Sequence, residues 1–224
     1  MTVRVTRITS VPGQPSDYSD EMLNSLLSLA DVMATGYHAA RVANVTTGDT
    51  VVVVGDGAVG LCGVIAAKLR GAKQIIAMSR HEDRQKLATE FGATDIIAER
   101  GDEAVEKVMA LTNNAGADAV LECVGTEQSN DTAMKVGRPG AIVGRVGLPH
   151  EPKMDMASSF YNNTIIAGGP ASVTTYDKQT LLKAVLDGGI HPGKVFTKAF
   201  SLDDIDEAYQ AMTKREAIKS LIIV

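Results

Sequence analysis

Cysteines, basic clusters and long apolar runs are scarce in this 224-residue sequence, and each scarcity excludes a class of protein. The two cysteines, Cys62 and Cys123, lie far apart without metal-type spacing, so we expect buried thiols. The net charge of −5 and the absence of a long basic stretch argue against a nucleic-acid partner. The apolar runs are short and interrupted, which argues against a membrane span, and the N-terminus lacks a signal-peptide layout. We therefore expect a soluble cytoplasmic protein.

Glycine, in contrast, is abundant, and its most informative use follows a run of valines. A predicted strand over 50–54 leads into Gly55-Asp56-Gly57-Ala58-Val59-Gly60 and a predicted helix over 58–70. In a G-x-G-x-x-G turn the first glycine permits the tight turn, the second lets the backbone approach a pyrophosphate, and the third lets the helix sit close on the sheet. The helix N-terminus then presents free N–H groups to the phosphates. The alternative is a glycine turn that merely joins a strand to a helix.

Strands and helices alternate from Thr50 onward, which predicts an α/β fold. Short apolar strands between helices indicate a parallel sheet covered on both faces, with the doubly wound (Rossmann) strand order 3-2-1-4-5-6. The expected strands are 50–54, 74–78, 94–97, 118–123, 140–146 and one near 163–168. The expected helices between them are 58–70, 81–91, 102–112 and 127–136. Helical segments over 24–43, helices at 177–187 and 203–213, and a strand at 219–224 complete the fold.

The residues after the second strand bear on the choice of nicotinamide cofactor. An NAD-binding unit of this type carries an acidic residue there, which binds the ribose 2′-OH. This sequence has Ser79 and Arg80, with Arg84 soon after, and a hydroxyl and guanidinium groups favour a 2′-phosphate. Arg100 follows the neighbouring third strand and could reach the same pocket, so we expect NADP, with NAD as the alternative. In the competing interpretation Ser79 and Glu82 form a capping box and the arginines are solvated.

From about Leu23 to Val224 the chain resembles the cofactor-binding half of the zinc-dependent medium-chain alcohol dehydrogenases. The motifs that carry the resemblance are Asp31-Val-Met-Ala-Thr-Gly-Tyr-His38, Gly55 to Gly60, Glu90-Phe-Gly-Ala-Thr-Asp95, Glu122-Cys-Val-Gly125 and Ala217-Ile-Lys-Ser-Leu221. Ser79-Arg80 is similar to the pair in NADP-dependent microbial secondary-alcohol members. The resemblance implies reversible oxidation of an alcohol to an aldehyde or ketone, with hydride passing to NADP and zinc polarising the oxygen.

The resemblance also implies positions around the cofactor. It places Asp31 at a ligand of the catalytic zinc, although an aspartate there could equally cap a helix. It places Thr35 near the nicotinamide. The residues implied at the carboxamide are Val146, Gly147 and Leu148, and those implied on the adenosine side are Cys123, Val124 and Gly125.

The sequence departs from this family at its N-terminal side. The catalytic domain with its Cys ligand and Gly-His-Glu motif is not found, nor is the four-cysteine zinc lobe, and a catalytic zinc needs about three protein ligands where Asp31 is one. We therefore expect a truncated dehydrogenase without a complete catalytic site or bound zinc.

Its expected parts are a linker from the catalytic domain (1–30), the NAD(P)-binding domain (31–190) and a segment returning to the catalytic domain (191–224). We also expect a homo-oligomer that pairs through a sheet edge near 153–155. A small alcohol or carbonyl substrate is expected only if the missing domain is supplied. The alternatives are a zinc-independent, quinone-reductase-like enzyme and a non-catalytic NADP-binding module.

Overall fold

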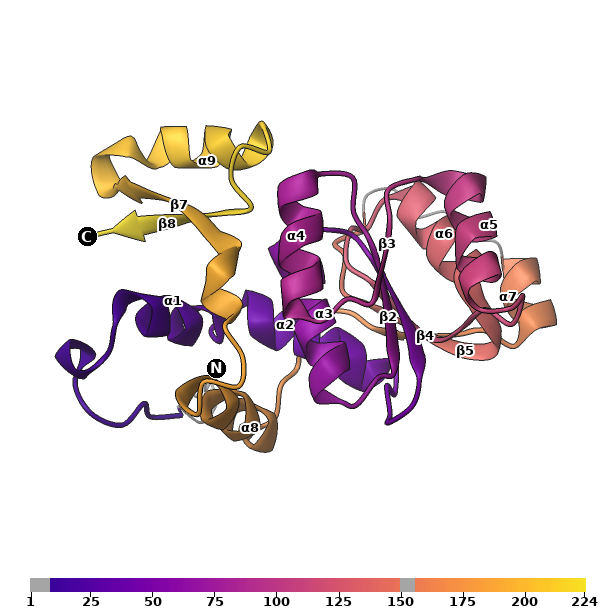
Figure 1. Ribbon diagram of the computed structural model, residues 1–224, viewed down its shortest axis with the longest axis horizontal. Helices are drawn as coiled ribbons and strands as arrows, with labels where there is room; N and C mark the ends of the chain where they lie inside the picture. The colour runs from indigo at the N-terminus through magenta and orange to yellow at the C-terminus, as the bar shows by residue number, and fades with distance from the viewer. Residues whose placement is uncertain (1–8, 150–155) are drawn as a thin grey trace, which may run out of the picture.

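The computed structural model describes residues 9–149 and 156–224, and its centre is a six-stranded parallel sheet (Figure 1). The strand order is β3-β2-β1-β4-β5-β6, which confirms the predicted doubly wound arrangement. The strands are β1 (Thr50–Val54), β2 (Gln74–Met78), β3 (Asp95–Ile97), β4 (Ala117–Glu122), β5 (Gly137–Arg145) and β6 (Ile165–Gly168).

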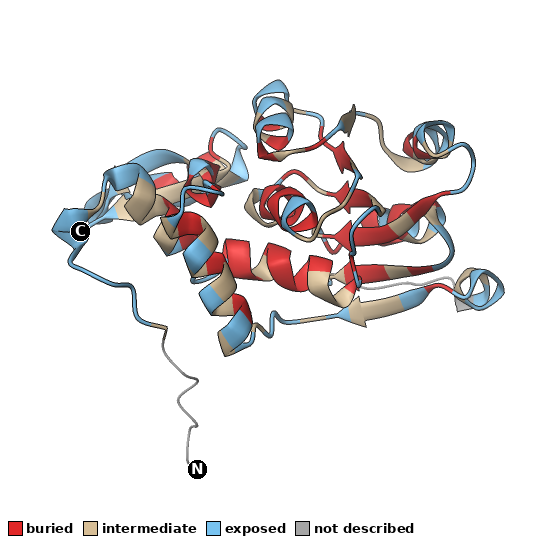
Figure 2. Ribbon diagram, turned by 60° about the horizontal axis from the view of Figure 1, so that its bottom comes forward, coloured by how far each residue is buried: buried red, intermediate tan, exposed pale blue. Residues whose placement is uncertain are grey.

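Helices cover both faces of the sheet, and buried residues concentrate in the strands and the helices against them (Figure 2). One face carries α2 (Val32–Val42), α3 (Ala58–Leu69) and α4 (Glu82–Phe91), and the other carries α5 (Gly101–Leu111) and α6 (Glu127–Val136). The consecutive valines of β1 alternate between the two cores. Val51 and Val53 pack on the α3 side, whereas Val52 and Val54 pack on the α6 side. Each buried valine contributes about 1.5–3 kcal/mol, so a strand buried on both faces favours an unbroken apolar run.

Helix α2 lies in backbone contact with its neighbours on both sides. A Cβ at Gly36 would lie 2.6 Å from the backbone nitrogen of Gly63 in α3. A Cβ at Gly144 in β5 would lie 2.2 Å from the carbonyl oxygen of Ala39 in α2. No side chain fits at either contact, so glycine sets how closely α2 approaches α3 and β5.

A smaller unit lies beside the main sheet (Figure 1). It contains β7 (Phe196–Ser201) and β8 (Lys219–Ile223), which pair in parallel, together with α9 (Ile205–Thr213). Next to it lie α1 (Asp20–Ser28) and a 3₁₀ turn at Pro192–Val195, and α8 (Thr175–Leu186) packs against α1. The backbone N–H of Gly193 donates to Ser25 Oγ at 3.2 Å, and Nη2 of Arg84 donates to the carbonyl of Ala217 at 3.5 Å. The first contact ties the 3₁₀ turn before β7 to α1, and the second ties the smaller unit to α4.

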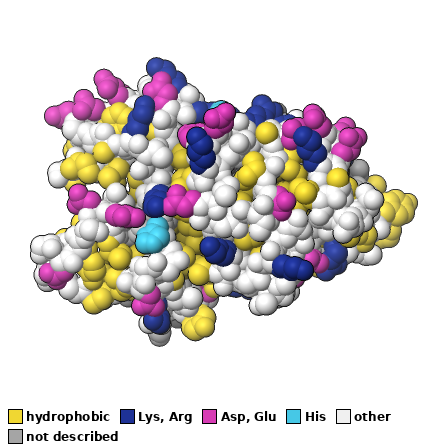
Figure 3. Space-filling view, in the orientation of Figure 1, with side chains coloured by type: hydrophobic (Ala, Val, Ile, Leu, Met, Phe, Trp, Pro, Cys, Tyr) yellow, Lys and Arg dark blue, Asp and Glu magenta, His cyan; other side chains and the backbone are white. Residues whose placement is uncertain are grey.

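The expected helices and strands are confirmed within four residues of their predicted bounds. The sequence analysis missed β7 and α7 (Met156–Asn162). The apolar residues of β7, Phe196, Ala199 and Phe200, do not alternate along the strand, so no period-two pattern marks it. Helix α7 is short and leaves Phe160 and Tyr161 78% and 81% exposed, and hydrophobic side chains gather at this end of the molecule (Figure 3). Across the two described ranges, no helix has the length and apolar character required to span a bilayer.

Candidate functional site

The glycine turn joins β1 to α3 through close backbone contacts. Gly55 has φ +115°, a conformation that other residues rarely adopt. A Cβ at Gly60 would lie 2.0 Å from the carbonyl oxygen of Gly55, so the first turn of α3 rests on the end of β1. Gly57 differs, because a Cβ there would meet no atom within 4 Å. It is the N-cap of α3 and no side chain caps this end, so the helix N-terminus faces open space.

Asp56, between the first two glycines, organises the residues that follow β2. Its Oδ2 accepts hydrogen bonds from Ser79 Oγ at 2.9 Å and from the backbone N–H of Arg80 at 3.3 Å. The Arg84 guanidinium donates to the Asp56 carbonyl at 3.2 Å and lies 3.5 Å from Oδ1. All three side chains, Asp56, Ser79 and Arg84, are buried. The hydroxyl proton of Ser79 and the charge of Arg84 are therefore directed at Asp56.

The capping-box interpretation of Ser79 and Glu82 is wrong. Helix α4 begins at Glu82 and its N-cap is His81, which makes no side-chain capping bond. Ser79 lies two residues before the cap, and its hydroxyl points to Asp56 instead. The partner of Ser79 lies in another turn of the chain, and for that reason local spacing did not reveal it.

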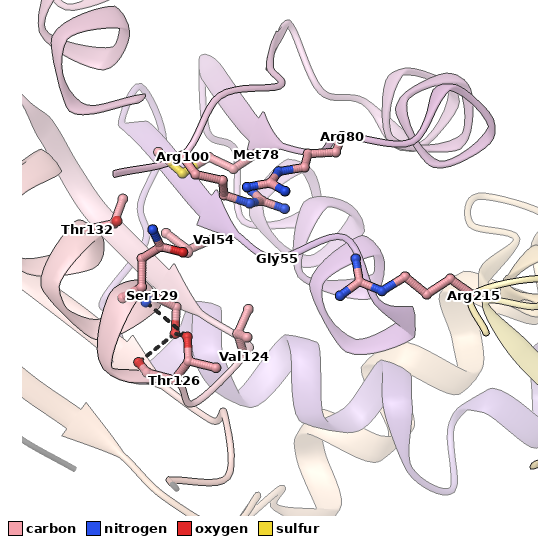
Figure 4. Close-up of a pocket in the computed structure, with 11 residues that line it drawn as sticks. Val54, Gly55, Met78, Arg80, Arg100, Val124, Thr126, Ser129, Thr132 and Arg215 are labelled. Carbon is pink, nitrogen blue, oxygen red and sulfur yellow. Dashed lines mark hydrogen bonds between the residues drawn. The ribbon is translucent and has the colours of Figure 1, made fainter. Parts of the chain in front are cut away.

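A cavity of about 230 Å³ opens at the carboxyl ends of β1, β2 and β4 (Figure 4). Arg80 and Arg100 extend along one side of it, and Arg215 enters from the smaller unit of β7, α9 and β8, which we call the C-terminal unit. The cavity is lined by Val54, Gly55, Met78, Arg80, Arg100, Val124, Thr126, Gln128, Ser129, Thr132 and Arg215. These residues include three guanidinium groups and no carboxylate. The structure thus brings together four predicted cofactor residues, Gly55, Arg80, Arg100 and Val124, and leaves Ser79 and Arg84 behind the cavity wall.

The charges around Arg100 show how strongly positive this cavity is. Burial lowers the pKa of Arg100, Asp56 raises it, and the neighbouring Arg80 and Arg215 lower it further. The pKa of a guanidinium lies far above neutral pH, so Arg100 keeps its charge there. Asp56 is already paired with Arg84. The cavity therefore has an excess of positive charge.

Glu122 at the end of β4 connects the two loops implied to hold the nicotinamide and the adenosine side. Its buried Oε1 accepts from the backbone N–H groups of Val124 at 2.8 Å and Gly125 at 2.7 Å. Its carbonyl accepts from those of Val146 at 2.9 Å and Gly147 at 3.1 Å. The loops at 123–125 and 146–148 thus lie side by side at the carboxyl edge of the sheet. Leu148 at the end of the second loop is 72% exposed.

Both cysteines lie on the α3 side of the sheet, where Cys62 is buried as expected and Cys123 is half-buried. Burial raises the pKa of both thiols well above the ordinary range. Both stay protonated at neutral pH, so neither is a reactive thiolate.

Asp31 and Thr35 lie at the start of α2, near the start of α3. Asp31 occupies the N-cap position, but its carboxylate makes no capping hydrogen bond, so the capping interpretation is wrong. It is 68% exposed and lies 3.6 Å from Lys219 Nζ. Thr35 is half-buried beside Gly36, which packs against Val59. Within the described ranges no three His, Cys, Asp or Glu residues lie close enough together to hold a metal ion. The residues present here do not fit a catalytic zinc.

Seven lining residues of the cavity were not predicted from the sequence. Val54 and Met78 end β1 and β2. Four others, Thr126, Gln128, Ser129 and Thr132, come from α6 and its N-cap, where Thr126 Oγ1 accepts the backbone N–H of Ser129 at 3.1 Å. The polar run after β4 was a usable signal for these. Arg215 has no such local signal, because it enters from a different unit of the chain.

Known proteins similar to this chain are alcohol dehydrogenases or members of their family. A family model described as zinc-binding dehydrogenase matches residues 58–186. An alcohol dehydrogenase of Cupriavidus necator is 29% identical over 218 residues, covering 93% of this chain and 57% of the relative. An NADP-dependent isopropanol dehydrogenase of Clostridium beijerinckii is 30% identical over 214 residues, covering 92% of this chain and 61% of the relative.

A solved structure shares the fold along most of the chain. The alcohol dehydrogenase TADH from Thermus sp. ATN1 superimposes with a TM-score of 0.83 at 30% identity. The match covers 94% of this chain and 60% of that one. The chain thus spans about three fifths of the length of the relatives it matches.

Proposed function

We propose a cofactor-binding role in alcohol oxidation for this chain, which belongs to the zinc-binding dehydrogenase family. The complete enzyme would interconvert a small alcohol and its aldehyde or ketone, with a nicotinamide cofactor as hydride carrier. The chain spans about three fifths of the length of its relatives. The activity of the complete enzyme, and the catalytic domain that it requires, are therefore part of the proposal. The family assignment agrees with the resemblance on which the sequence analysis relied.

The proposed cofactor is NADP, and the observation that carries this choice is the charge of the cavity. A ribose 2′-OH needs a carboxylate acceptor, whereas a 2′-phosphate needs cationic donors. Arg80 and Arg100 line the cavity, and no lining residue is acidic. The nearby carboxylate, Asp56, already accepts from Ser79 and pairs with Arg84. The NADP-dependent relative from Clostridium beijerinckii supports the same choice.

Each part of the site then has a task in holding the cofactor. The open N-terminus of α3 behind Gly57 would receive the pyrophosphate, since its N–H groups have no side-chain cap. Arg80 and Arg100 would hold the 2′-phosphate. The loop at 146–148 would border the nicotinamide carboxamide and the loop at 123–125 the adenosine side, and Glu122 joins the two loops. Bound NADP supplies the hydride acceptor, and the chain supplies binding and orientation.

A non-catalytic NADP-binding module is the second candidate. The observation in its favour is Asp31, the single zinc-ligand candidate, which is paired with Lys219. Measuring alcohol oxidation with and without a separately supplied catalytic domain of this family distinguishes the two candidates. Alcohol turnover in the mixture supports the enzyme, whereas an absence of turnover supports the non-catalytic module.

We also propose that the chain forms a homo-oligomer. Strand β6 is an edge of the main sheet, and an exposed edge tends to be paired or covered. Ile165 in this strand and Phe160 and Tyr161 in α7 are exposed near that edge. The segment near 153–155, where we expected the contact, lies outside the described residues.

Calorimetric titration of the unmodified chain with NADPH and NADH tests the cofactor proposal. We expect NADPH to bind about 30-fold more tightly, which corresponds to about 2 kcal/mol. Arg80→Ala and Arg100→Ala should each weaken NADPH about tenfold and leave NADH unchanged, since each removes a charge-assisted bond. Arg138→Ala is the matched control, because Arg138 pairs with Asp118 away from the cavity. Equal affinities of the unmodified chain for both cofactors contradict the proposal.

A further inference from the structure

Arg215 has a backbone conformation that its residue type does not favour. It follows α9 with φ +62°, in the left-handed region. In the described residues, the other non-glycine positions with positive φ are all asparagines, which tolerate this region better. Holding an arginine there costs free energy unless the surroundings compensate, and such positions cluster at binding sites.

The side chain of Arg215 reaches across the boundary between the two units of the structure. It lines the cavity opposite the residues of α6, while Arg80 and Arg100 come from the main sheet (Figure 4). Its Nη1 lies 3.2 Å from Nε2 of His81, at the start of α4. The next residues hold it in place, because the carbonyl of the buried Ala217 accepts from Arg84.

Three positive charges therefore converge without a carboxylate among the lining residues. Like charges at short range repel, and a dianion between them relieves that repulsion. The remaining lining, with Met78 and Val124 beside the hydroxyls of Thr126 and Ser129, suits a base and a ribose. The lining of the cavity thus suits a ligand that is a nucleoside carrying a phosphate monoester.

We propose that Arg215 is a third ligand of the 2′-phosphate of NADP, so that the cofactor is held between the main sheet and the C-terminal unit. This inference rests on the proposed NADP-binding function. It adds that cofactor discrimination depends on a residue outside the nucleotide-binding fold. It also adds that a bound 2′-phosphate connects the C-terminal unit to Arg80 and Arg100.

The test compares 2′,5′-ADP with 5′-AMP, which differ only in the 2′-phosphate. Calorimetric titration of the full chain should give tighter binding of 2′,5′-ADP. Arg215→Gly should weaken 2′,5′-ADP about tenfold, or about 1.4 kcal/mol, and leave 5′-AMP unchanged. Glycine suits the left-handed φ, so the urea midpoint should stay equal or rise, which separates lost binding from lost folding. Lys214→Ala, next in the chain but outside the cavity, is the matched control and should change neither ligand.

The outcomes separate this inference from the proposed function. If the unmodified chain binds both nucleotides equally, the NADP proposal fails and this inference fails with it. If it prefers 2′,5′-ADP and Arg215→Gly keeps the full preference, only the role of Arg215 is overturned. Competition with inorganic phosphate identifies the source of the anion. Displacement of 2′,5′-ADP by phosphate at equal concentration would assign the arginines to free phosphate and overturn the inference.

Discussion

Replacing Gly57 by alanine should weaken cofactor binding without weakening the fold. Gly57 has φ −74° and ψ 177°, a conformation open to alanine, and the added Cβ would meet no protein atom within 4 Å. Alanine is a poorer N-cap than glycine but restricts the unfolded chain more. These opposing effects are each below about 1 kcal/mol, so the free energy of unfolding should stay within that range.

The same methyl group would stand where a pyrophosphate approaches the N-terminus of α3. Forcing a group into an occupied contact costs about 1–3 kcal/mol, which weakens affinity about 5- to 150-fold. Gly60→Ala should behave in the opposite way. Its Cβ would lie 2.0 Å from the Gly55 carbonyl oxygen, so β1 and α3 must separate and the unfolding free energy should fall by about 1–3 kcal/mol.

Urea unfolding and calorimetric titration with NADPH measure both effects on the same samples. Stability near that of the unmodified chain combined with a clear loss of affinity in Gly57→Ala supports the assigned turn. Gly48→Ala is a control at another open glycine, although its φ of +96° will cost some stability. Unchanged NADPH affinity in Gly57→Ala would refute the placement of the pyrophosphate at this turn.

Four further results are expected. Asp56→Ala should lower the unfolding free energy by about 3–5 kcal/mol in urea titrations, because it leaves the buried Arg84 charge unpaired, and Asp56→Ala/Arg84→Met should recover much of the loss. Burial, and then the charge of Arg41, lower the pKa of His38 below 6.5 in the folded state. The unfolded state therefore binds this proton at a higher pH than the folded state does. Stability should therefore fall as the pH drops below about 6.5, and His38→Gln should flatten that part of a urea-midpoint series. Light scattering should give a mass well above 23.6 kDa, and a monomer at micromolar concentration contradicts the proposed oligomer. Elemental analysis after dialysis should find less than one zinc per chain, since no three potential ligand residues lie together in the described residues.

The main sheet was predictable because its signals are local. The valines of β1 and the glycines after them specify a strand, a turn and a helix within one short stretch. The same is true of β2 and β4, whose residues also face two cores and therefore form apolar runs. Strand β7 was missed, because its apolar residues Phe196, Ala199 and Phe200 follow no regular alternation. A cytoplasmic location stays a prediction.

Site residues were predictable where a local motif or the strand order places them. They were not predictable where the contact joins segments that are distant in the sequence. Arg80 and Arg100 follow adjacent strands, so sheet order alone placed both in one cavity. The partner of Ser79 could not be read from spacing, since Asp56 lies in a different crossover. Arg215 was missed because it is distant in the sequence from the other lining residues and reaches the cavity in the folded chain.

The glycine contacts of α2 have a mechanical consequence. This helix meets α3 at Gly36 and β5 at Gly144 through backbone atoms, with no flexible side chain between them to absorb displacement. Sliding or rotating α2 would drive backbone into backbone, so α2 moves with the sheet as one rigid body. A displacement of α1 relative to the sheet would therefore have to be absorbed in the short link at Leu29–Asp31, because α2 itself cannot yield.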